Sequence, residues 1–283
     1  MNRPLQRARG FARVRFQASP PTRPGGATLL ELRHQSPCRM LMPRDDDPLP
    51  TGVLITTTGG LTGGDHVECR FQADAGARVR LTTQAAEKIY KARPGDGPVH
   101  IDVTLTAGPG AWLEWVPQET ILFDHSALKR VTRLDVYSGG EVLAAEMSVL
   151  GRAAHGERWT RGLLHERWSV SVDGQLRWLD ALRLDDDGPL HSPQAFQGAR
   201  ALATMVYVGP TPDDACRDAL RQCLHDALQP QCAGGVTRVN GVIIGRLMGP
   251  DPQAVRRSLG DALSSARAML ADLPPELPRV WHT

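Results

Sequence analysis

The stretch HVECRFQADAGARVRLTT, residues 66–83, contains two runs, HVECRFQA and ARVRLTT, in which apolar and polar residues alternate. A period of two is typical of a β-strand that buries one face. Similar runs occur on both sides of it, from Phe11 to about Val208. They are FARVRFQA, ATLLELRH, GVLITTT, VHIDVTLT, AWLEWV, VTRLDVY and EVLAAEMSVLG, with further strands expected at 163–172, 175–184 and 201–208. The sequence therefore predicts many short strands.

Clusters of turn-forming residues separate these runs. The chain has 28 glycines and 22 prolines, and clusters such as GGLTGGD, RPGDGP and DDDGP lie between the runs. An Asp-Gly pair at 173–174 predicts a hairpin. No stretch before residue 210 alternates helix with strand, so a doubly wound parallel sheet is not expected. We expect a mainly β fold of many short, mostly antiparallel strands in stacked or wound, β-helix-like sheets.

The last third of the chain has a different pattern. Residues 213–228 place apolar side chains at helical spacing, and residues 251–270 do so after Asp251, a suitable N-cap, and Pro252. Between them, GGVTRVNGVIIGRLMGP predicts two strands joined at Asn240-Gly241. We expect one domain over residues 1–283, with a β-rich body at 10–210 and a helix–hairpin–helix portion at 211–283.

Composition excludes several classes of protein. The net charge of +2 without a concentrated basic stripe argues against nucleic-acid binding, and no apolar run is long enough to cross a membrane. The five cysteines form no Cys-x-x-Cys pair, which is typical of reduced thiols in the cytoplasm. The nine histidines match no zinc motif, and no Gly-x-Ser-x-Gly is present, so neither a closed metal site nor a nucleophile elbow is expected.

The loop TTTGGLTGGDH, residues 56–66, concentrates Gly59, Gly60, Gly63 and Gly64 before Asp65. Its spacing resembles a phosphate-binding loop, but Asp65 stands where such a loop has lysine, and a strand follows instead of a helix. Phosphate binding is therefore not expected. The glycines predict a structural turn or a close backbone approach. Asp65 either accepts backbone N–H bonds in that turn or attracts a cation, and the sequence leaves both open.

Polar side chains occur where a core would be apolar. Thr82 and Gln84 lie at the end of a predicted strand, and Glu119 and Asp124 lie within WLEWVPQETILFDHS, residues 112–126. Carboxylates among large apolar groups are costly unless they are paired, exposed at an interface or functional. A carboxylate pair of the glycosidase kind is one alternative, which would make the protein a hydrolase on a β fold.

Four blocks in order carry a specific resemblance: GGLTGGD at 59–65, TTQAAEKIYKA at 82–92, LEWVPQETILFDHSAL at 113–128 and EMSVLGRAAHGE at 146–157. In their residues and distances they resemble the urease accessory protein UreD (UreH) family. The resemblance extends from about residue 10 to 210 and continues more loosely to LPRVW at 277–281.

The resemblance implies a non-enzymatic, β-rich scaffold with two helices. Members of that family bind UreF, which recruits the GTPase UreG, and the assembly docks on apo-urease so that nickel reaches the urease active site. The partners implied are UreF, UreG through UreF, and apo-urease, in the cytoplasm.

A protein that passes nickel on should not retain it. Because Ni²⁺ stands high in the affinity order, a cage of His and Cys would hold it, whereas separate oxygen donors would release it. We therefore expect no tight metal site and no tightly bound cofactor, and only transient nickel. The residues predicted to form a transient nickel path or a polar interior are Asp65, Thr82, Gln84, Glu119, Asp124 and Glu146.

Overall fold

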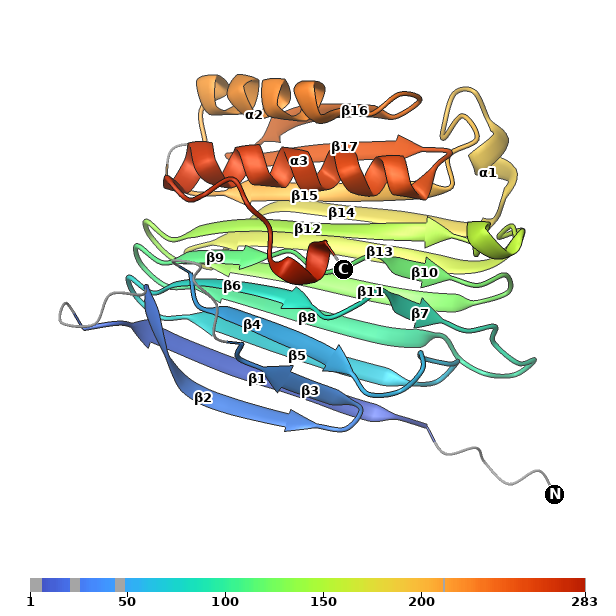
Figure 1. Cartoon of the computed structure of the whole chain (residues 1–283), viewed down its shortest axis with the longest axis horizontal. Helices are drawn as coiled ribbons and strands as arrows, with labels where there is room; N and C mark the ends of the chain where they lie inside the picture. Colours follow the sequence, from blue (N-terminus) through green and yellow to red (C-terminus); the bar gives the residue numbers. More distant parts are fainter. Residues whose placement is uncertain (1–6, 21–25, 44–48, 211, 283) are drawn as a thin grey trace.

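Two β-sheets form the body of the protein, and the chain winds between them (Figure 1). The computed structural model describes residues 7–20, 26–43, 49–210 and 212–282. The first sheet contains, in spatial order, β14 (Gln175–Asp186), β13 (Arg161–Val172), β11 (Ala127–Val136), β8 (Val99–Ala107), β5 (His66–Ala73), β1 (Arg9–Ala18) and β2 (Ala27–Gln35). The second contains β16 (Ala233–Val239), β17 (Val242–Gly249), β15 (Ala201–Val208), β12 (Glu141–Leu150), β9 (Trp112–Trp115), β6 (Arg78–Thr83), β4 (Thr51–Thr56) and β3 (Cys38–Leu41).

The turn inside the stretch 66–83 shows how the winding works. β5 lies in the first sheet and β6 in the second, and the turn between them carries the chain across, with Ala77 donating to the Asp74 carbonyl at 2.9 Å. Each later turn repeats the crossing, so β5, β8, β11 and β13 are parallel neighbours. The colours in Figure 1 therefore run in order from one end of the stack to the other.

The predicted mainly β, wound fold is confirmed, but the expectation of mostly antiparallel strands is wrong. Nine of the fifteen strand pairs in the described residues are parallel. Antiparallel pairs occur toward the ends of the stack, including β13 with β14 and β16 with β17. The physical reason is that most turns connect the two sheets, whereas a hairpin would connect neighbours in one sheet.

Two apolar layers follow from this arrangement. One lies between the sheets, and the other lies between the second sheet and two helices, α2 (Asp214–Ala227) and α3 (Pro252–Ala271). β12 is covered on both faces, which is why nearly all of its residues are buried. Figure 1 shows α3 alongside β15 and β17.

The predicted C-terminal elements are confirmed, including the hairpin β16–β17 at Asn240-Gly241. Asp213 caps α2 by accepting from the Cys216 N–H at 2.8 Å, and Asp251 caps α3. A short helix α1 (Gly188–His191) and the 3-10 turns η1 (Ala153–His155) and η2 (Arg279–Trp281) were not expected. Within the described ranges, no helix combines the length and the apolar character needed to cross a membrane.

The second sheet is interrupted in its middle. β6 ends at Thr83 and resumes as β7 (Glu87–Ile89), and β9 ends at Trp115 and resumes as β10 (Thr120–Leu122). The neighbouring β12 runs through unbroken and pairs with both β9 and β10. Pro117 lies in the gap, and because proline lacks an N–H it cannot donate to a ladder.

Side chains replace the missing ladder bonds at this interruption. The Thr82 hydroxyl donates to the Val116 carbonyl at 2.7 Å, and the Thr83 hydroxyl accepts from the Gln118 N–H at 2.8 Å. From the C-terminal segment, the Trp281 indole N–H donates to the same Val116 carbonyl at 2.9 Å. The interruption is therefore a defined structure held from both sides.

Two arginines of α3 attach the helix to the interrupted strands. Arg267 and Glu114 are fully buried, with the Arg267 Nε 3.1 Å from the Glu114 carboxylate. Arg256 forms an ion pair with Glu119 and stacks on the Trp281 ring at 4.9 Å. Charge pairing thus accounts for Glu114 and Glu119, which both lie among large apolar residues in the stretch 112–126.

Gly60 and Gly64 show why the loop 56–66 is rich in glycine. A Cβ at Gly60 would lie 2.7 Å from the Lys88 carbonyl, so the loop packs directly on β7. Gly64 has φ +85°, a left-handed conformation, and a Cβ there would approach Arg7 Nε at 3.0 Å. Gly59 and Gly63 make similarly close contacts with Tyr90 and residues 96–97.

We predict that Gly64→Val destabilises the fold by about 1–3 kcal/mol, because a β-branched residue is strained at positive φ. Thermal melting of the wild type and the variant measures this. Gly97→Val is the matched control, since no atom lies within 4 Å of a Cβ there and its φ is not left-handed. Equal melting midpoints for Gly64→Val and the wild type would contradict the claim that residue 64 must be glycine because of its positive φ.

Candidate functional site

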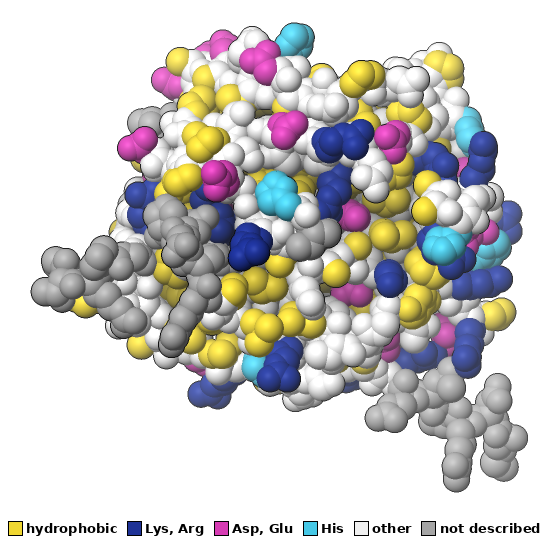
Figure 2. Space-filling view, in the orientation of Figure 1, with side chains coloured by type: hydrophobic (Ala, Val, Ile, Leu, Met, Phe, Trp, Pro, Cys, Tyr) yellow, Lys and Arg dark blue, Asp and Glu magenta, His cyan; other side chains and the backbone are white. Residues whose placement is uncertain are grey.

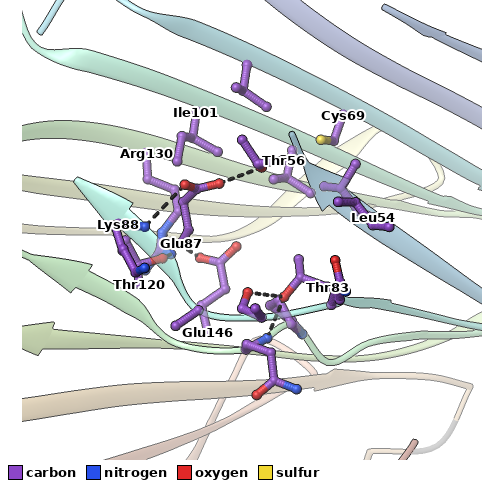
Figure 3. Close-up of a pocket in the computed structure, with 18 of the residues that line it drawn as sticks. Leu54, Thr56, Cys69, Thr83, Glu87, Lys88, Ile101, Thr120, Arg130 and Glu146 are labelled. Carbon is purple, nitrogen blue, oxygen red and sulfur yellow. Dashed lines mark hydrogen bonds and ion pairs between the residues drawn. The ribbon is translucent and has the colours of Figure 1, made fainter. Parts of the chain in front are cut away.

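A cavity of about 220 Å³ opens at the interruption of the second sheet. The exposed residues Gln84 and Ala85 of the loop and Lys88 of β7 form its rim, and the first sheet forms its floor. We call it the first cavity. Figure 3 labels ten of the residues that line it: Leu54, Thr56, Cys69, Thr83, Glu87, Lys88, Ile101, Thr120, Arg130 and Glu146.

A buried cluster of charges lies at the inner end of the first cavity. Arg130 is 5% exposed, and its guanidinium forms ion pairs with Glu146 on β12 and Glu166 on β13. It also donates to the Thr120 hydroxyl at 2.9 Å and to the Ser148 hydroxyl at 3.0 Å. We call Arg130, Glu146 and Glu166 the buried triad.

Glu146 has further hydrogen bonds on its other side. Its Oε1 accepts from the Thr132 hydroxyl at 2.8 Å and from the Trp115 indole N–H at 3.3 Å. Burial raises the pKa of Glu146, and Arg130 offsets only part of that effect. Burial alone would lower the pKa of Arg130, but Glu146 and Glu166 outweigh it, so the guanidinium pKa is raised and Arg130 keeps its charge.

Glu87 is a second carboxylate on the wall of the first cavity. It accepts from the Thr56 hydroxyl at 2.6 Å and from the Lys88 N–H at 3.1 Å. Burial raises the pKa of Glu87, and these two hydrogen bonds offset part of the rise. Glu87 therefore holds its negative charge at a cost in stability that its exposed neighbours do not have.

Two of the six predicted polar residues, Gln84 and Glu146, line this cavity. Gln84 lies at the exposed rim, and Glu146 lies at the inner end. Thr82 is fully buried but is not one of the lining residues, and its hydroxyl donates to the Val116 carbonyl. The structure brings Gln84 and Glu146 to one cavity, and a role for them in a nickel path stays a prediction.

Asp65 lies outside the cavity walls. It is 5% exposed, and its two oxygens accept from the Ala8 and Thr62 N–H groups, both at 2.8 Å. These bonds hold the glycine loop against the N-terminal segment before β1. The sequence left open whether Asp65 stabilises the turn or attracts a cation, and this geometry favours a role in stabilising the turn.

Glu119 and Asp124 are also placed away from the first cavity. Glu119 pairs with Arg256 on the helix side of the second sheet. Asp124 accepts from the Thr160 N–H at 2.7 Å and the Thr160 hydroxyl at 3.0 Å. Partial burial alone would raise the pKa of Asp124, but these bonds and those from Arg161 and His125 lower it. Both carboxylates tie segments together.

Arg130 and Glu166 are not among the residues predicted from the sequence, although the sequence contains a signal for both. On β11, Arg130 and Thr132 share a face with the buried Leu128 and Leu134. On β13, Glu166 likewise shares a face with the buried Leu164 and Trp168. A charge at a buried position of an alternating strand is the pattern that identifies them.

Potential soft-metal ligands are few. Among the residues with described positions, no three His, Cys, Asp or Glu side chains come together as a metal-binding group. Cys69 lines the first cavity as a buried free thiol, and its pKa is raised by contact with Cys38 and by burial. The donors that do converge are the oxygens around Arg130.

Comparison with known proteins identifies the family. Residues 8–282 match the family model described as "UreD urease accessory protein". The chain belongs to the UreD family. The UreD proteins of Magnetococcus marinus, Methylobacterium radiotolerans (UreD 1) and Xanthobacter autotrophicus are 36%, 37% and 38% identical to it, each over 98% of this chain. The alignments cover 95%, 93% and 91% of those relatives.

The predicted resemblance to the UreD family is therefore confirmed over nearly the whole chain. The names of these relatives describe a urease accessory protein and not a hydrolase. This favours a helper of urease over the carboxylate-dependent hydrolase. In this UreD-family chain, the four sequence blocks contribute to one region: three of them line the first cavity, and the fourth contributes Glu146.

We predict that Glu87→Gln stabilises the protein near neutral pH. Because burial raises the pKa of Glu87, the folded state binds this proton more tightly than the unfolded chain does. The destabilisation is therefore complete above the folded pKa and disappears below the unfolded value of about 4.3. Thermal melts across pH should give the variant a higher melting temperature than the wild type near pH 7. This difference in melting temperature should disappear on acidification. Glu31→Gln on the exposed β2 is the control. A difference in melting temperature between Glu87→Gln and the wild type that does not change with pH would contradict the prediction.

Proposed function

We propose that this protein is a non-catalytic scaffold in urease maturation. In the cytoplasm it docks on apo-urease and, with UreF and the GTPase UreG, supports GTP-dependent insertion of nickel into the urease active site. The observation that carries the proposal is the family match over residues 8–282, together with relatives named urease accessory protein. UreG associates through UreF.

The site chemistry supports nickel as cargo. The first cavity reaches from exposed rim residues to the buried triad and offers carboxylate, hydroxyl and amide oxygens. Such donors bind Ni²⁺ less tightly than a His and Cys cage would, which suits transfer. We propose that nickel passes through this protein transiently and contacts Glu146 and Gln84, the two predicted residues that line the cavity.

The proposed partners are proteins. Figure 2 shows acidic and basic side chains spread over the same face, with hydrophobic side chains between them. A mixed surface of this kind is typical of protein contacts, whereas nucleic-acid binding would use a concentrated basic patch.

Urease activation in cells tests the proposed function. In cells that make urease, UreF and UreG, we expect deletion of this protein to leave urease unmetallated. Complementation with the wild-type chain should restore both the nickel content and the activity of purified urease by at least about tenfold. Immunoblots confirm equal urease levels. Full nickel loading in the deletion strain would refute the proposal.

We also predict that the purified, tag-free wild-type chain binds Ni²⁺ weakly. A cargo protein without a ligand cage should show dissociation constants of about micromolar or weaker by calorimetry. A stoichiometric site of about nanomolar affinity would be incompatible with transient passage.

A further inference from the structure

A second cavity, of about 440 Å³, lies between the sheets next to the first. It is enclosed by β13 and β14 on one side and by β15, β16 and β17 on the other. Its walls are mostly apolar, and Glu166 is the buried carboxylate among them. Trp168, Leu182, Phe196, Leu202 and Met248 are among its apolar walls.

The buried triad stands between the two cavities. Arg130 and Glu146 line the first cavity, and Glu166 lines the second. Arg130 and Glu166 occupy paired positions on the adjacent strands β11 and β13 and form an ion pair. A cation that passed from one cavity to the other at this point would have to displace the guanidinium.

The guanidinium occupies a position that is surrounded by oxygen atoms. Two carboxylates, from Glu146 and Glu166, and two hydroxyls, from Thr120 and Ser148, contact Arg130 from three different strands. All four residues are at most 8% exposed. Carboxylate and hydroxyl oxygens around one point form the kind of site that binds a hard or borderline divalent cation.

One carboxylate oxygen in this cluster retains capacity for another partner. The Glu146 Oε2 lies 3.1 Å from Arg130 Nε, but neither atom makes a hydrogen bond within the described part of the chain. Glu146 is 4% exposed and lines the first cavity. A buried carboxylate oxygen that has an ion-pair partner but no hydrogen bond can accept a further donor or cation.

We propose that Arg130 is a tethered cation that occupies a latent divalent-cation site, formed by Glu146, Glu166, Thr120 and Ser148, and leaves it when a metal ion enters. Nickel as that ion rests on the proposed function, whereas the site itself rests on the geometry. Two carboxylates and one guanidinium carry a net charge of −1, and a divalent ion in place of the guanidinium would neutralise both carboxylates. Competition with Arg130 keeps the affinity low, and movement of its side chain connects the two cavities.

Arg130→Met tests the proposal, because methionine keeps an unbranched stem without the charge. With NiCl₂ as the probe, calorimetry on the purified, tag-free chain should show one Ni²⁺ per chain, bound at least about tenfold more tightly than by the wild type. Ni²⁺ should also raise the melting temperature of Arg130→Met more than that of the wild type. Both gains should disappear in the triple variant Arg130→Met/Glu146→Gln/Glu166→Gln.

Arg256→Met is the matched control, since Arg256 also pairs with a carboxylate but lies outside both cavities. It should gain no Ni²⁺ affinity. If Arg130→Met folds and gains no affinity, or if the gain persists in the triple variant, the proposal is overturned.

A second variant covers the case in which Arg130→Met does not fold. Glu166→Gln keeps the shape of the site and the pair between Arg130 and Glu146. The weak Ni²⁺ binding of the wild type should fall at least about threefold in this variant, and unchanged binding overturns the proposal. These measurements need no urease, UreF or UreG, so they stand or fall separately from the cell experiment on the proposed function.

Discussion

The interruption of the second sheet at residues 116–119 is the constraint on which the rest of the site depends. Pro117 cannot donate to a ladder, while β12 continues unbroken beside the gap. The backbone groups left without ladder partners must be satisfied elsewhere. Thr82 and Thr83 do so from one side and Trp281 from the C-terminal segment. The cavity and the docking of the C-terminal segment are thus two results of one break in the sheet.

The buried triad has a cost that structural stability does not explain. Buried ion pairs gain little over apolar residues of the same volume, because each charge loses its hydration. Arg130 pairs with two carboxylates, and the Oε2 atom of one of them, Glu146, makes no hydrogen bond within the described residues. Apolar side chains at these positions would fill the space between the sheets without losing hydration or leaving a hydrogen-bond acceptor unpaired. A role in binding a cation at the cavity therefore explains the cluster better than a role in stability does.

The sequence predicted the local structure well and the long-range arrangement poorly. Alternation identified strands such as β5 and β6, and caps at Asp213 and Asp251 identified the helices. Alternation cannot tell whether the next strand lies in the same sheet or the facing one, so the strand directions were missed. For the site, residue type suggested Glu146 but could not separate it from Glu119 and Asp124. Only the fold shows which carboxylate faces a cavity and which ties two segments together.

The parallel winding also determines how the protein must fold. His66 pairs with His100, Val99 with Leu128, and Ala127 with Leu163, so partners are 34, 29 and 36 positions apart. Each pairing closes a loop of about thirty residues before any ladder bond forms, which slows folding compared with hairpins. Until the next turn arrives, the last strand added presents an unpaired edge. The nascent chain is therefore exposed to aggregation one winding at a time, and its growing end is where a folding chaperone would be needed.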